Sequence, residues 1–117
     1  MGHLSTHVLD TASGRPAAGV PVALKRLAPD GTAELVASAV TNADGRTDRP
    51  LVEGTALAVG IYELTFQVGA YFAGAGVTGE PPFLDVVPVR FGVSDPDGRY
   101  HVPLLIAPGS YTTYRGS

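Results

Sequence analysis

IYELTFQV, at residues 61–68, is the stretch that decides the fold. From Tyr62 to Val68 every second residue is aromatic or aliphatic, and polar residues from Glu63 to Gln67 fill the positions between them. Successive side chains of a strand point to opposite faces, so this period of two predicts a strand with one buried and one polar face.

Similar apolar stretches lie on both sides of this strand, separated by turns rich in Gly and Pro. Two of the turns, PDG at 29–31 and NADGR at 42–46, carry residues that favour tight turns. A short helix is expected at 71–77, although its glycines weaken it. The further strands are expected at 4–10, 20–27, 34–41, near Leu51, at 84–93, 99–107 and 111–115. The pattern predicts an all-β antiparallel sandwich that forms a single domain over residues 1–117.

The composition excludes several classes of protein. With 44% hydrophobic and 16% charged residues, the 117-residue chain is typical of a folded domain. It has no cysteine, so neither a disulfide nor a thiolate contributes. A net charge of −3 with scattered basic residues argues against a nucleic-acid partner. No stretch is long enough to span a membrane, and no signal-peptide pattern opens the chain. We therefore expect a soluble, cytoplasmic protein with no membrane partner.

The three histidines are His3, His7 and His101. His3 and His7 are separated by about 13 Å on an extended strand, so they cannot share a metal ion by themselves. We expect no metal and interpret His3 as a solvated terminal residue. His7 and His101 alternate with the apolar residues of their strands, which predicts that both lie on outer faces of the sandwich. From the pattern alone, exposed or interface histidines are favoured over catalytic ones.

Two further motifs do not indicate a site. Residues 74–79 match GxGxxG, but two prolines follow and no βαβ unit surrounds the match, so a dinucleotide site is not expected. Residues 95–98 (DPDG) resemble the start of a calcium loop without its remaining ligands, and a hairpin turn is expected there. Neither Arg46 nor Arg90 is informative by itself.

Four stretches carry a more specific signal. They are LSTHVLDTASGRPAAGVPV (4–22), TNADGRTD (41–48), FLDVVPVRFGV (83–93) and YHVPLLIAPGSYTTYRGS (100–117). Together they resemble the 5-hydroxyisourate hydrolase family of transthyretin-like proteins, over essentially the whole chain. The terminal YRGS is the most specific match. One departure is GAYF at 69–72, where the family commonly has GDYF.

The resemblance implies a fold, an assembly and a site. The implied fold is the transthyretin-like sandwich of two four-stranded sheets with one short helix, and the implied assembly is a homotetramer, a dimer of dimers, with sites in the channel between dimers. By position, the catalytic residues would be His7, Arg46 and His101. The substrate-binding segment would be Tyr114, Arg115, Gly116 and Ser117.

The implied activity is hydrolysis of a ring amide of 5-hydroxyisourate to 2-oxo-4-hydroxy-4-carboxy-5-ureidoimidazoline, with no metal or organic cofactor. Such a reaction needs a base for water, a group that stabilises the oxyanion, and an orienting group. A neutral histidine can accept a proton from water, and a permanently charged arginine can bind the oxyanion. Which histidine is the base stays open at this point. The alternatives are a small-ligand carrier of the transthyretin type and a sandwich module that only mediates contacts.

Overall fold

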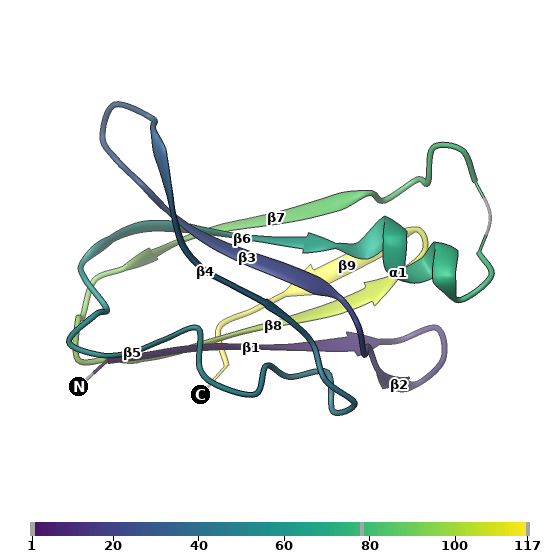
Figure 1. Cartoon of the computed structure of the whole chain (residues 1–117), viewed down its shortest axis with the longest axis horizontal. Coiled ribbons are helices and arrows are strands. Elements are labelled where there is room, and N and C mark those ends of the chain that lie inside the picture. The colour runs from purple at the N-terminus through teal and green to yellow at the C-terminus, as the bar shows by residue number, and fades with distance from the viewer. Residues whose placement is uncertain (1, 78, 117) are drawn as a thin grey trace.

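The computed structural model describes residues 2–77 and 79–116, and these form a two-layered β-sandwich with one short helix (Figure 1). Ser117, expected at the site, therefore lies outside the described residues. The elements in chain order are β1 (Gly2–Asp10), β2 (Arg15–Pro16), β3 (Pro21–Leu27), β4 (Ala33–Val40), β5 (Val52–Gly54), β6 (Gly60–Gln67), α1 (Val68–Gly74), β7 (Val86–Val93), β8 (Arg99–Ala107) and β9 (Ser110–Thr113).

The two layers are a five-stranded and a four-stranded sheet. In the five-stranded sheet the order is β2-β1-β8-β9, and β5 also pairs with β1. The four-stranded sheet has the order β4-β3-β6-β7. Both expected sheets are therefore present, and the count of five arises because the short strands β2 and β5 both pair with β1. The strand expected near Leu51 is β5, whereas β2 was not expected.

One pairing departs from the antiparallel expectation, because β1 and β8 run parallel to each other. Parallel neighbours need a long crossover between them. Here the crossover is most of the chain, which forms the whole four-stranded sheet before it returns (Figure 1). This pairing places the N-terminal strand directly beside the strand that carries His101.

The core lies between the two sheets and is built from the alternating residues of the strands. Along β1, buried and half-buried residues alternate at every position. On β6 the predicted apolar series is buried, with Tyr62, Leu64 and Phe66 at most 2% exposed. The fully buried side chains of the five-stranded sheet include Leu4, Val8, Leu104 and Ile106. Because these faces are turned inward, the intervening positions of β1 and β8 form an outer face.

The helix begins earlier than predicted, at Val68 instead of residue 71. Val68 continues the apolar series of β6 and is fully buried, so its burial fits a strand or a helix equally well. Gly69 allows the first turn to pack closely, because a Cβ there would lie 2.9 Å from the Leu84 carbonyl oxygen. The helix then presents Tyr71, whose hydroxyl donates a 2.8 Å hydrogen bond to the Asp10 carboxylate at the end of β1.

The DPDG turn at 95–98 is not a hairpin turn, which corrects the prediction. It joins β7 of the four-stranded sheet to β8 of the five-stranded sheet. The Asp95 carboxylate accepts the Asp97 N–H, and the Asp95 carbonyl accepts the Gly98 N–H. The local turn chemistry was predicted correctly, but the same chemistry serves a crossing between layers.

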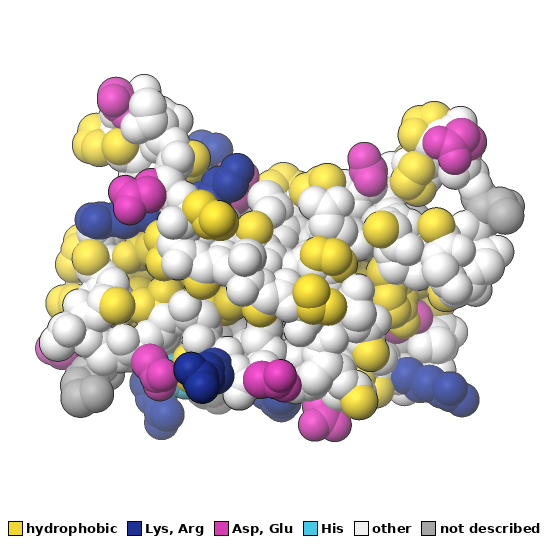
Figure 2. Space-filling model, viewed as in Figure 1, with side chains coloured by type: hydrophobic (Ala, Val, Ile, Leu, Met, Phe, Trp, Pro, Cys, Tyr) yellow, Lys and Arg dark blue, Asp and Glu magenta, His cyan; other side chains and the backbone are white. Residues whose placement is uncertain are grey.

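The surface seen in Figure 2 carries apolar side chains in patches across its middle, while charged side chains lie mainly toward the outline. Over the described residues, no helix has the length and apolar character required to cross a bilayer.

Candidate functional site

The outer face of the five-stranded sheet brings residues from five segments of the chain together. His3, Ser5 and His7 are half-buried on this face of β1, as the alternation predicted for His7. Strand pairing and two isolated bridges arrange the neighbours in three rows: Glu53, His3 and Arg99; Ser5, His101 and Gly116; and Arg46, His7 and Pro103. The three residues expected to be catalytic therefore occupy two adjacent rows.

The spacing of His7 and His101 follows from the sheet. Ser5, not His7, is the direct partner of His101 across β1 and β8. His7 lies two residues further along, so its Cα is about 8 Å from that of His101, given about 3.3 Å per residue and about 4.8 Å between strands. Two imidazole side chains on one face at that spacing can contact a single small ring placed over the sheet.

The loop after β4 places Arg46 against β1. Asn42 shapes the turn, because its side-chain Oδ1 accepts the N–H groups of Asp44 and Arg46. Gly45 adopts φ +75°, and its carbonyl accepts the Val8 N–H at 2.8 Å. A Cβ on Gly45 would lie 2.3 Å from the Val8 carbonyl oxygen, so only glycine permits this approach.

The same loop fixes the ring of His7. Nε2 of His7 lies 2.9 Å from the carbonyl oxygen of Asp44. A carbonyl oxygen only accepts hydrogen bonds, so Nε2 carries the proton and donates it. In neutral His7 the lone pair is therefore on Nδ1, and no other residue among 2–77 and 79–116 donates a hydrogen bond to it.

His101 is held from two sides. Its Nδ1 lies 2.8 Å from the Ser5 hydroxyl oxygen, and its carbonyl accepts the Gly116 N–H at 2.7 Å. The ring packs directly on Gly116, because a Cβ there would lie 2.6 Å from Cδ2 of His101. The described part of the C-terminal segment thus continues the β8–β9 pairing and contacts the imidazole at Gly116.

The electrostatic surroundings favour a neutral His101. Burial lowers its pKa below the ordinary value of 6.5, and electrostatic interactions with Arg46, His7 and His3 lower it further. His3 lies two residues from Ser5 on the same half-buried face of β1 and is therefore near the site, which the sequence interpretation as a solvated terminal residue missed. Its position on the same face of β1 as His7 was the available signal.

The remaining C-terminal residues are arranged differently. The Arg115 guanidinium lies 4.3 Å from the ring centroid of Tyr100, whose side chain is buried, and donates to the Arg99 carbonyl. Tyr114 is 57% exposed. Both residues border a hollow at the edge of the sandwich, between β7 and β9, that Phe91 also lines. Of the expected binding segment, Gly116 contacts His101, and substrate contacts by Tyr114 and Arg115 stay a prediction.

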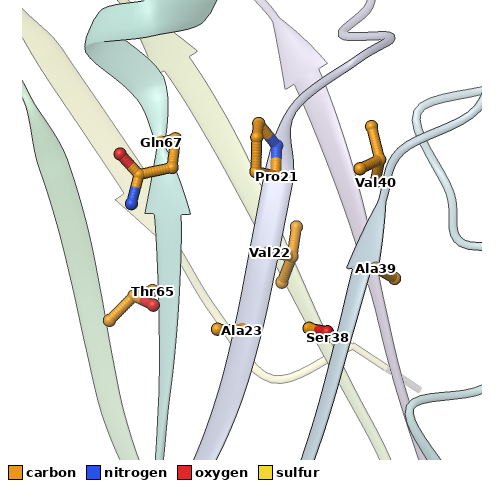
Figure 3. A pocket seen from close by; sticks show the side chains of 8 residues that line it. All are labelled: Pro21, Val22, Ala23, Ser38, Ala39, Val40, Thr65 and Gln67. Atoms are coloured by element: carbon orange, nitrogen blue, oxygen red, sulfur yellow. The ribbon is translucent and has the colours of Figure 1, made fainter.

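A hollow on the four-stranded sheet differs from this site in its side chains. A hollow over the outer face of the four-stranded sheet is lined by side chains such as Pro21, Ala23, Val40, Thr65 and Gln67, and none of its lining residues is ionisable (Figure 3). Among residues 2–77 and 79–116, no group of three or more His, Cys, Asp or Glu side chains is placed to hold a metal ion.

Comparison with known proteins assigns the chain to a family. The model of the HIUase/Transthyretin family matches residues 4–116. A 5-hydroxyisourate hydrolase of Deinococcus radiodurans is 59% identical, over 99% of this chain and 98% of the relative. The solved structure of Klebsiella pneumoniae 5-hydroxyisourate hydrolase is 41% identical with a TM-score of 0.83, over the full length of both chains. Sea bream transthyretin in complex with thyroxine is 32% identical with a TM-score of 0.86, over 97% and 93% of the two chains. The chain belongs to the HIUase/transthyretin family.

Proposed function

We propose that this chain is a 5-hydroxyisourate hydrolase whose reaction is carried out by His7, Arg46 and His101. The observation that carries the proposal is that His7 pairs with Arg46 and lies two residues along β1 from Ser5, the strand partner of His101. The product is 2-oxo-4-hydroxy-4-carboxy-5-ureidoimidazoline, formed when water adds to a ring carbonyl and the adjacent C–N bond breaks.

The surroundings of each residue support a role. His101, held neutral by burial and neighbouring positive charge, accepts a proton as water attacks the carbonyl carbon. The exposed guanidinium of Arg46 stabilises the negative charge that develops on the carbonyl oxygen. His7, with Nδ1 free to accept, orients the attacking water. When the tetrahedral intermediate collapses, His101 returns the proton to the leaving ring nitrogen, so the residues end unchanged.

The carrier alternative is less well supported. The relative named as a hydrolase is 59% identical, whereas the transthyretin solved with thyroxine is 32% identical. A carrier also gives no reason for an arginine to sit beside two histidines on one small area. A module that only mediates contacts would need none of these groups.

A turnover assay with freshly prepared 5-hydroxyisourate tests the proposal. Decay of substrate absorbance is compared with the spontaneous background, because the free substrate decays by itself. Replacing His7, Arg46 or His101 by alanine should in each case lower kcat/KM at least about 10²-fold, the scale of losing a base or an oxyanion partner. Losses in double variants should not add, because residues that act together fail together. Wild-type turnover no faster than background would reject the hydrolase assignment.

The assembly proposed is a homotetramer, a dimer of dimers. The site lies on a half-exposed outer face, and the edge strands β7 and β9 expose Val86 and Tyr111 at 43% and 42%. Both features suit a surface covered by another copy of the chain. Light scattering should give a mass near four times the 12.0 kDa of the chain. A monomer at micromolar concentration would contradict this.

We further propose that residues 1–117 act as one domain, which is supported by a hydrophobic cluster that both sheets share among the described residues. The expected cytoplasmic location stays a prediction.

The C-terminal tetrapeptide, Tyr114 to Ser117, is proposed to line the site. Its deletion should abolish turnover with little change in melting temperature, because Tyr114 and Arg115 are exposed and exposed terminal residues bury little apolar surface. Full activity of the shortened chain would refute this role.

A further inference from the structure

Ser5 contacts His101 at the centre of the outer face. The two residues are partners in the parallel β1–β8 pairing, and Oγ of Ser5 lies 2.8 Å from Nδ1 of His101. We propose that Ser5 is a positioning residue whose hydroxyl accepts a hydrogen bond from Nδ1–H of His101, so that the Nε2 lone pair faces the substrate. The inference rests on the proposed function, in which His101 accepts a proton from water.

Of the two ring nitrogens of His101, the geometry leaves Nε2 to act as the base. Nδ1 is occupied by Ser5, and the Cδ2 edge lies against Gly116. The neighbouring Thr6 cannot substitute for Ser5, because it is turned inward and its hydroxyl donates to the Val102 carbonyl at 2.7 Å. Ser5 is thus the hydroxyl on the outward side of β1 that reaches the ring.

The direction of the hydrogen bond decides what His101 can do. A neutral imidazole has one N–H and one lone pair. If Ser5 donated to Nδ1, the proton would be on Nε2 and the ring would present a donor to the substrate. If Ser5 accepts from Nδ1–H, Nε2 is free to act as a base. After Nε2 gains a proton, Nδ1–H still donates to Ser5, so the same contact serves the whole proton cycle.

A neutral partner suits this ring better than a carboxylate would. The charged or titratable groups that act on His101 are Arg46 from the loop and His7 and His3 from β1, and all of them oppose its protonation. Across the β1–β8 pairing, Arg99 lies beside His3, and Glu53 lies on the other side of His3. A carboxylate at position 5 would raise the pKa of the imidazole, whereas a hydroxyl orients it without adding charge.

Three variants of Ser5 separate positioning from simple packing. Ser5→Ala removes the acceptor and should lower kcat about 10- to 100-fold with little change in KM, the scale found when a group that orients a metal-bound histidine is lost. Ser5→Thr keeps a hydroxyl and should restore most of the activity. Ser5→Asp should move the acidic limb of the pH–rate profile to higher pH. The matched control is Ser38→Ala, an exposed serine of β4, which should leave kcat and the pH profile unchanged.

Nitrogen NMR of labelled His101 tests the inference without turnover. The neutral ring should be protonated on Nδ1 in the wild type and should lose this preference in Ser5→Ala. Protonation on Nε2 in the neutral wild type would overturn the inference, as would wild-type kcat and an unchanged pH profile in Ser5→Ala. Absence of wild-type turnover would instead reject the proposed function, and the NMR result would still decide the role of Ser5.

Discussion

His7 on β1 and Arg46 in the loop after β4 are partners in an isolated antiparallel bridge, so a single loop sets an arginine beside a histidine. The contact depends on the residue before Arg46. Gly45 approaches β1 so closely that any side chain would meet the Val8 carbonyl oxygen. A residue that need not touch the substrate therefore controls where the arginine lies.

Gly45→Ala should damage both stability and activity. The added Cβ would lie 2.3 Å from the Val8 carbonyl oxygen, and φ of +75° disfavours a side chain by about 1–2 kcal/mol. We expect a larger loss than that from backbone strain alone, together with a fall in kcat/KM as Arg46 moves. Urea unfolding and the turnover assay measure the two effects.

The matched control is Gly31→Ala, in the turn between β3 and β4. Gly31 has φ +88°, but a Cβ there would meet nothing within 4 Å. This variant should show the strain of positive φ and keep its kcat/KM. Equal losses of stability and activity in the two variants would refute the dependence of the site on the Gly45 contact.

Gly116→Ala should lower activity with little effect on stability. Its Cβ would lie 2.6 Å from Cδ2 of His101, so the imidazole must shift. A displacement of about 1 Å can reduce a rate about 10²-fold. Gly109→Ala is the control, because a Cβ there meets nothing within 4 Å. If both variants keep wild-type kcat/KM, Gly116 does not help to place the ring.

The strand pattern predicted much of the fold and the face of each histidine. Alternation on the first and eighth strands placed His7 and His101 opposite the core, and both are on the outer face. The helix was misplaced because the burial of Val68 is compatible with either kind of element. Turn residues at 95–98 could not reveal whether the chain folds back or crosses to the other sheet, since both connections use the same local conformations.

Local sequence patterns could not predict that the residues of the candidate site come together. Ser5 and His101 meet only because β1 and β8 pair in parallel, across most of the length of the chain. Arg46 reaches β1 through a loop whose docking depends on a tertiary contact at Gly45. The roles of His7, Arg46 and His101 came from the resemblance in sequence, and the structure adds the contacts that make those roles chemically reasonable.

Tyr71→Phe should destabilise the fold in a pH-dependent way. Burial raises the pKa of Asp10, but hydrogen bonds from Tyr71, Ser13 and Ala12 outweigh it and leave the pKa below 3.8. Burial and then the contact with Asp10 raise the pKa of Tyr71 to about 12, so the hydroxyl keeps its proton at neutral pH. A hydrogen bond to a charged group contributes about 1.5–3 kcal/mol, and a loss of this order is expected at pH 7.

The sign of the pH effect follows from the lowered pKa of Asp10. Its ionised form contributes stability above pH 3.8, and this is lost as the pH falls through the folded-state pKa. The gap between wild type and Tyr71→Phe in urea unfolding should therefore be wider at pH 7 than at pH 3. Tyr111→Phe, at a β9 tyrosine that does not supply the hydrogen bond to Asp10, should change stability by the same amount at both pH values. A gap independent of pH would contradict the charge-assisted bond.

The pH dependence of turnover should reflect His101. Burial, Arg46, His7 and His3 hold its pKa below 6.5, so the imidazole stays neutral under mildly acidic conditions. The acidic limb of kcat/KM should lie below pH 6.5, because only the neutral ring accepts a proton from water.

Arg46→Met removes a positive charge near the ring, so the pKa of His101 followed by NMR should rise in that variant even though turnover is lost. The neutral ring also contributes stability above the unfolded pKa of about 6.5, and this is lost as the pH falls through the folded-state value. His101→Asn should therefore flatten that part of the stability profile. An NMR titration of His101 at or above 6.5 in the wild type, or one that Arg46→Met leaves unchanged, would show that this histidine is not the base held neutral by its surroundings.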